Sequence, residues 1–264
     1  MTWFVLGVVG AFGLLIGSFL NVVIWRVPRG QSVVRPPSAC PSCGAAIRRR
    51  DNIPVVSWLV LRGRCRDCSA PISPRYPVVE SLTGVLFVLV AVRFGGGSSA
   101  PGWAIPAYLY LAGIAVALAF IDLDTHRLPN SIVLPAIVVA PALLAIASGA
   151  TGDWAAFVRA LAGGAVLFAA YFLMLIAYPA GMGFGDVKLA AVLGMYLGWI
   201  GWGALVVGGF AAFLLGGVFS IGLLVMHRAG RKTGIPFGPW MILGALVGIG
   251  WGTQVWDGYL RLFM

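Results

Sequence analysis

Two short acidic motifs lie at the edges of apolar runs in this chain. Asp122 and Asp124 close one run, and Asp186 follows the alternating glycines Gly181, Gly183 and Gly185. An ionisable side chain inside or at the rim of an apolar segment is costly to bury, so it is a candidate functional group. Two carboxylates that share a site hold one proton between them. The ionised one can activate water while the protonated one polarises a peptide carbonyl, as in aspartic proteases.

Other interpretations of these acids remain open. The Gly183-Phe184-Gly185-Asp186 motif could be only a helix N-cap, and buried acids could relay protons in a transporter. A transporter of this kind often contains inverted repeats, and the sequence has no evident internal repeat. In a third interpretation, a membrane assembly scaffold, the acids would be dispensable.

Four cysteines form a second candidate site. They occur as two Cys-x-x-Cys pairs, Cys40/Cys43 and Cys65/Cys68, in the one long polar segment. Two such pairs can present four thiolates to one tetrahedral Zn²⁺, as in a zinc ribbon. Two disulfides are the alternative, but a reducing cytoplasm and a loop with little apolar core favour a structural metal. An iron site would use the same ligands.

The elements that carry these residues are predicted to be membrane helices. Hydrophobic residues make up 60% of the chain and charged residues only 10%, which excludes a water-soluble fold. A helix needs about 20 apolar residues to cross the bilayer. Eight segments approach this length, of which the sixth is short: Trp3–Ile24, Val78–Phe94, Trp103–Ile121, Ser131–Ser148, Ala160–Tyr178, Val187–Ile200, Trp202–Met226 and Pro236–Val255.

The basic residues predict the orientation of these helices. With eight spans, fifteen of the eighteen Lys and Arg fall in loops on one side, which is then the cytoplasmic side. Only Arg93, Arg159 and Arg261 fall on the other side. The net charge of +10 is therefore explained by membrane orientation, and we expect no nucleic-acid partner. Both acidic motifs are predicted to lie at the cytoplasmic face.

The predicted fold is an all-α polytopic membrane protein with a small zinc-ribbon-like insertion between its first two long helices. We expect three parts: a first transmembrane helix (residues 1–24), a cytoplasmic metal-binding loop domain with the four cysteines (25–77) and a transmembrane domain with the acids (78–264). The helix ends suggest how the acids divide one proton. Asp122 lies near a helix C-terminus, which disfavours a carboxylate, and Asp186 near a helix N-terminus, which favours one.

Taken together, the motifs resemble those of the bacterial type IV prepilin peptidases, also called leader peptidase/N-methyltransferases. The resemblance runs from about the first span to the last. It rests on Gly17-Ser18-Phe19-Leu20-Asn21, the paired cysteine motifs around Asn52-Ile53-Pro54, Arg75-Tyr76-Pro77-Val78-Val79-Glu80, Ile121-Asp122-Leu123-Asp124, Gly183-Phe184-Gly185-Asp186-Val187-Lys188-Leu189 and Pro236-Phe237-Gly238-Pro239.

The resemblance implies an inner-membrane aspartic endopeptidase that cuts the leader from type IV prepilins and pseudopilins at the cytoplasmic face. It also implies methylation of the new N-terminus by S-adenosylmethionine, without indicating which residues bind this donor. Carried over by motif, Asp122 and Asp186 are the catalytic pair. Asp124, Gly183, Gly185 and Lys188 are supporting residues.

Overall fold

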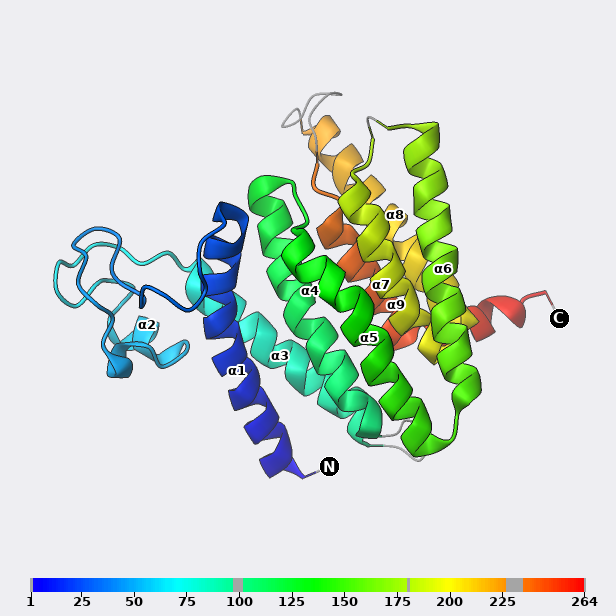
Figure 1. Ribbon diagram of the computed structural model, residues 1–264, viewed down its shortest axis with the longest axis horizontal. Coiled ribbons are helices and arrows are strands. Elements are labelled where there is room, and N and C mark those ends of the chain that lie inside the picture. The colour runs from blue at the N-terminus through cyan, green and yellow to red at the C-terminus, as the bar shows by residue number, and fades with distance from the viewer. Residues whose placement is uncertain (1, 97–101, 180, 227–234, 264) are drawn as a thin grey trace. The chain divides into compact units, whose positions relative to one another are not determined.

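The computed structural model describes residues 2–96, 102–179, 181–226 and 235–263, and its regular elements are helices (Figure 1). Within these ranges the only β pairing is two isolated bridges, Ala39 with Ala46 and Arg64 with Pro71. The all-α prediction is confirmed. The helices are α1 Trp3–Arg26, α2 Val56–Val60, α3 Arg75–Gly95, α4 Ile105–Thr125, α5 Asn130–Thr151, α6 Trp154–Ala177, α7 Phe184–Ile200, α8 Trp202–Val225 and α9 Gly238–Leu260.

Six of these helices are long and apolar enough to cross a membrane: α1, α3, α4, α5, α6 and α8. Helix α7 has 17 residues, which corresponds to about 26 Å at 1.5 Å per residue and is shorter than the hydrocarbon core. Helix α9 is long enough, but Thr253, Gln254 and Asp257 make its last turns polar. The chain is a membrane protein, and the count of eight spans stays a prediction.

Helix α6 begins earlier than the sequence predicted. It starts at Trp154 rather than Ala160, because Oδ1 of Asp153 accepts a hydrogen bond from the backbone N–H of Ala156 at 2.9 Å. An aspartate in this position satisfies one of the free N–H groups of the first turn. The cap adds almost two turns to the predicted span.

Small residues allow three pairs of helices to approach closely: α1 with α3, α6 with α7, and α8 with α9. A Cβ added at Gly13 would lie 2.8 Å from Cα of Gly84, and one at Gly163 would lie 2.6 Å from the carbonyl oxygen of Gly194. Large apolar side chains meanwhile point outward, as Phe4 and Phe210 do. This distribution is typical of helices in lipid, where close backbone packing replaces the hydrophobic effect.

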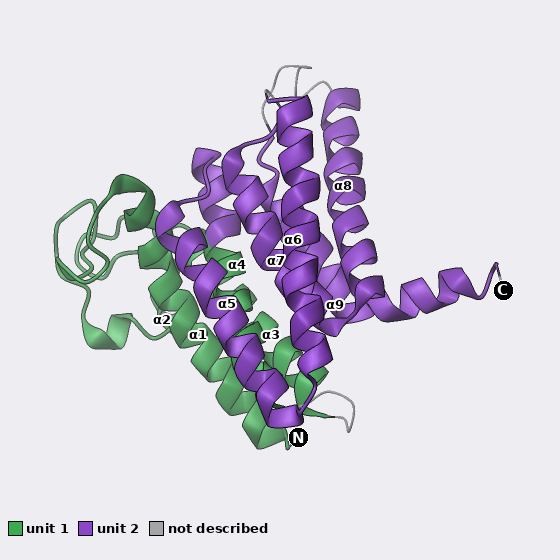
Figure 2. Ribbon diagram, turned by 45° about the vertical axis from the view of Figure 1, so that its right-hand side comes forward, with its two compact units in different colours: residues 1–117 green, residues 118–264 purple. Residues whose placement is uncertain are grey.

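The chain forms two compact units, Met1–Ala117 and Leu118–Met264 (Figure 2). In the first unit α1 packs on α3, and the cysteine-bearing segment connects them. In the second unit α7 is central and packs against α5, α6, α8 and α9. Eleven of its 17 residues are buried, all from Val187 onward, so the body of α7 is held by neighbours on several sides and its first turn lies nearer the surface. Asp122 and Asp186 both belong to this second unit.

Candidate functional site

Asp122 lies in the last turn of α4 and is buried, with only 4% of its surface exposed. Its Oδ2 accepts a hydrogen bond from the backbone N–H of Gly238, at the first residue of α9, across 3.0 Å. A Cβ at Gly238 would lie 2.8 Å from the same oxygen. Glycine at this position therefore allows the close approach of α9 to the carboxylate without a shift of either group.

Asp186 lies in the first turn of α7 and is half-buried. Its Oδ2 accepts a hydrogen bond from the backbone N–H of Gly183, the residue just before the helix, at 3.0 Å. This contact caps α7, so the N-cap interpretation describes part of what Asp186 does. A carboxylate has two oxygens, and the cap occupies only one of them.

The two carboxylates are close enough for their charges to interact. Leu128, in the turn after α4, lies between the segments that hold them. Its side chain would be 3.1 Å from a Cβ at Gly185 and 3.3 Å from one at Gly238. The ends of α4, α7 and α9 that carry this site lie at the same end of the second unit (Figure 2).

An aromatic cluster borders the acids. The ring centroid of Tyr171 in α6 lies 5.4 Å from that of Phe213 in α8 and 6.3 Å from that of Phe237. The phenol of Tyr171 also lies within the electrostatic range of Asp186. Tyr171 was not among the predicted site residues, because one buried tyrosine in an apolar helix has no distinguishing signal in the sequence.

The supporting residues differ in their placement. Asp124 is exposed, two residues beyond the buried Asp122. The ammonium of Lys188 donates to Oδ1 of Asn130 at the start of α5, and its Nζ lies 5.1 Å from the ring centroid of Phe184. Lys188 therefore links α7 to α5. The structure brings Gly183 and Gly185 next to Asp186 and Leu128, as described above.

The environment of Asp122 differs from the predicted one. The sequence predicted a helix C-terminus alone at Asp122, but the N-terminus of α9 also meets its carboxylate. Each acid therefore accepts a backbone N–H from the start of a helix, and at Asp122 the N-terminus of α9 offsets the C-terminus of α4. The Gly238-Pro239 pair was the signal for this second helix start, since proline is favoured in the first turn.

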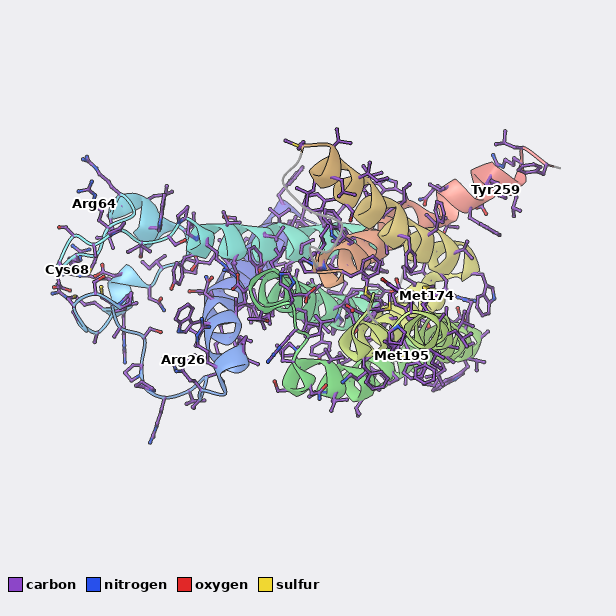
Figure 3. The ribbon with its side chains drawn as sticks, turned by 90° about the horizontal axis from the view of Figure 1, so that it is seen from above. Arg26, Arg64, Cys68, Met174, Met195 and Tyr259 are labelled. Atoms are coloured by element: carbon purple, nitrogen blue, oxygen red, sulfur yellow. The ribbon has the colours of Figure 1, made fainter. Side chains whose placement is uncertain are left out.

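The four cysteines meet at one point in the first unit. Their sulfur atoms all lie within 4.8 Å of one another, and the Sγ atoms of Cys40 and Cys68 are 3.8 Å apart. A tetrahedral Zn²⁺ with Zn–S bonds of about 2.3 Å would place sulfurs about 3.8 Å apart. All four are free cysteines, so the two-disulfide alternative is not the arrangement observed. Figure 3 shows Cys68 with Arg64 on this segment.

Both cysteine pairs have the same turn geometry. The backbone N–H of Gly44 donates to the carbonyl of Cys40, and that of Ser69 donates to the carbonyl of Cys65, each at 2.9 Å. Both Gly44 and Ser69 have positive φ, 74° and 61°. The backbone N–H groups of Cys43 and Ser42 also lower the pKa of the Cys40 thiol to about 6, which favours its thiolate. The pKa of the Cys68 thiol is raised instead, because hydrogen bonds with the other cysteines, Cys43 first, outweigh the backbone N–H of Ala70.

Comparison with known proteins agrees with this arrangement. Residues 11–94 match the family model described as "Bacterial Peptidase A24 N-terminal domain", and residues 109–221 match "Type IV leader peptidase family". The second match includes both Asp122 and Asp186. No solved structure matches the chain significantly.

Several curated relatives match nearly the whole chain, each named prepilin leader peptidase/N-methyltransferase. The relative from Aeromonas hydrophila is 38% identical over 100% of this chain and 97% of its own length. The relative from Stutzerimonas stutzeri is 38% identical and that from Pseudomonas aeruginosa 35%, each over 94% of this chain and 91% of its own length. These matches do not support the transporter alternative, and they confirm the resemblance seen in the motifs. The chain therefore belongs to the type IV leader peptidase family.

Proposed function

We propose that this protein is a membrane aspartic endopeptidase that removes the leader from type IV prepilins or pseudopilins. The observation that carries the proposal is the pairing of Asp122 and Asp186. They come from segments 64 residues apart, lie within range of each other's charge, and fall inside the leader peptidase match.

The geometry supports a shared-proton mechanism. Each carboxylate uses Oδ2 to accept a backbone N–H, and its Oδ1 is the oxygen available for chemistry. The ionised partner would take a proton from water, while the protonated partner hydrogen-bonds the scissile carbonyl oxygen. Because each acid accepts a backbone N–H from the start of a helix, helix ends do not decide which one carries the proton. We therefore propose that Asp122 and Asp186 act together as a catalytic dyad, and we do not assign the proton donor and the base to one residue each.

The substrate class fits a membrane enzyme. A prepilin has a short basic leader followed by a long apolar helix, so it would reach the site laterally from the lipid bilayer. We propose that the protein lies in the bacterial inner membrane with Asp122 and Asp186 near the cytoplasmic face. The basic bias of the loops supports this orientation. The predicted basic loop at residues 227–235 lies almost wholly outside the described residues.

We also propose methylation of the new N-terminus, with S-adenosylmethionine as the donor, as the names of the relatives suggest. Residues 25–77 would form the metal-binding domain, between the first helix at 1–24 and the peptidase domain at 78–264. Cys40, Cys43, Cys65 and Cys68 would hold one Zn²⁺, which supplies structure to this segment.

The test is incubation of the purified protein in detergent with a prepilin, read by mass, with and without S-adenosylmethionine. We expect loss of the leader mass and, with the donor, a gain of one methyl group. Asp122→Asn and Asp186→Asn should each lower cleavage by at least about 100-fold, whereas Asp124→Asn should lower it less. Substantial cleavage by either of the first two variants would contradict the dyad.

A further inference from the structure

The short helix α2 exposes an apolar face. Val56, Leu59 and Val60 are 52%, 61% and 70% exposed, and Ile53 just before the helix is 50% exposed. These side chains belong to a segment that is otherwise rich in arginine and proline. Apolar side chains grouped on a polar segment indicate a contact surface.

The opposite face of α2 is held in place. Oγ of Ser57 donates to the carbonyl of Arg50 at 3.0 Å, and Nε1 of Trp58 donates to the carbonyl of Ile72 at 3.1 Å. The Trp58 ring also covers Gly63, where an added Cβ would lie 2.9 Å from the ring. Because these contacts fix the rotation of α2, its apolar residues cannot turn inward.

A buried acid ties α2 to a membrane-spanning helix. The backbone N–H of Val55 donates to Oε2 of Glu80 in α3 at 2.7 Å, and Glu80 is only 8% exposed. Val55 has φ of +61°, an unfavourable conformation for a β-branched residue. Val78 and Leu82, on either side of Glu80 in the sequence, are apolar and exposed. The anchor of α2 therefore lies beside a part of α3 that faces lipid. In Figure 1, α2 lies at a level between the two ends of α1.

The charges around α2 suit an anionic surface. Two arginines of the segment form ion pairs within it, Arg48 with Asp67 at 2.8 Å and Arg66 with Asp51 at 2.6 Å. Four arginines close to α2 in the sequence are exposed and form no ion pair with the residues that the structure describes: Arg49, Arg50, Arg62 and Arg64. Exposed arginines next to apolar side chains are typical of segments that bind anionic lipid.

We propose that α2 is a membrane-docking element, with Ile53, Val56, Leu59 and Val60 in the boundary between the headgroups and acyl chains of the bilayer. The four exposed arginines would contact anionic headgroups. The cysteine-bearing segment then lies on the membrane and is fixed from two sides, by Glu80 and by lipid. This inference rests on the membrane location of the chain and is independent of the proposed peptidase activity.

Photocrosslinking in the full-length protein tests the proposal. The photoreactive residue p-benzoylphenylalanine replaces Leu59 or, separately, Val60, in nanodiscs of phosphatidylglycerol and phosphatidylcholine. Val34 provides a matched control, because it belongs to the same segment and is 77% exposed. We expect severalfold more lipid adduct by mass at positions 59 and 60 than at 34. Equal yields at all three positions would overturn the proposal. The proposal would also be overturned if lipid adducts at positions 59 and 60 formed only after a prepilin was added.

The arginines are tested in the same assay. The double variant Arg62→Gln, Arg64→Gln should lower the adduct yield at position 59 in nanodiscs with phosphatidylglycerol, and it should have little effect in phosphatidylcholine alone. An unchanged yield in the anionic nanodiscs would overturn the headgroup contact. Equal metal content and equal thiol reactivity of the four cysteines show that each variant retains the fold. The two crosslinking positions, 59 and 60, provide independent measurements.

Discussion

The backbone N–H of Gly238 donates a hydrogen bond to Oδ2 of Asp122 across 3.0 Å, although the two residues are 116 positions apart in the sequence. The contact brings the start of α9 to the end of α4. It orients one carboxylate of the proposed dyad and leaves Oδ1 as its other acceptor. A residue outside both acidic motifs thus sets the geometry of the site.

Substitution of Gly238 by alanine should impair cleavage without unfolding the protein. The added Cβ would lie 2.8 Å from Oδ2 of Asp122, so the carboxylate or α9 must shift. A displacement of about 1 Å costs about 100-fold in rate when reacting groups are aligned. Gly250→Ala in the same helix is the control, because nothing lies within 4 Å of its added Cβ. The measurement is kcat for a prepilin, and equal rates for the two variants would contradict the positioning role.

Asparagine and alanine at position 186 should separate the capping role from the catalytic one. The asparagine Oδ1 can still accept the N–H of Gly183, whereas alanine leaves that N–H without its side-chain partner. We expect both variants to be inactive, and only Asp186→Ala to lower the thermal stability. A cap of this kind contributes about 1 kcal/mol. If both variants lost the same thermal stability, loss of the cap would not explain the lower stability of Asp186→Ala.

The glycines before Asp186 should differ in their tolerance of alanine. A Cβ at Gly183 would meet Oδ2 of Asp186 at 3.5 Å, an ordinary contact, whereas one at Gly185 would press on Leu128 at 3.1 Å. Gly185→Ala should therefore lower kcat/KM for prepilin cleavage more than Gly183→Ala does. The two variants are compared at equal concentrations of folded protein. The reverse order would show that the Leu128 contact does not limit the site.

Removal of the metal should disrupt the segment between α1 and α3 more than the acid site. Cys43→Ser or strong chelation should increase tryptic cleavage at the arginines of this segment, because a small domain with little apolar core depends on its metal. Metal analysis of the pure protein should find one Zn²⁺ per chain. We expect methylation to fall more than cleavage in detergent. Four reactive thiols and no bound zinc or iron would contradict the metal site.

Reporter fusions test the orientation. Fusions after Arg93 and after Gly152 should report the side opposite the cytoplasm, and one after Arg127 should report the cytoplasm, because basic residues concentrate in cytoplasmic loops. A cytoplasmic signal from the first two would overturn the placement of Asp122 and Asp186 at the cytoplasmic face.

Several features of this protein follow from local sequence alone. The apolar runs predict membrane helices because each is long enough to cross the hydrocarbon core. The spacing within Cys40/Cys43 and Cys65/Cys68 predicts a four-sulfur site, since each pair presents two thiolates from one turn. The rarity of acids in apolar segments singles out Asp122 and Asp186. Each of these signals depends on residues that are close together in the chain.

The tertiary structure decided what depends on distant residues. The contact between Gly238 and Asp122 requires α9 to pack against the end of α4, which no local pattern encodes. The environment of Asp122 therefore differs from the one that its own helix suggested. The exposed face of α2 likewise depends on Ile72 and Glu80, which hold the helix from outside its own five residues. Helix packing brings residues together that are far apart in the chain. The sequence therefore predicted the two acids but not the backbone groups that orient them.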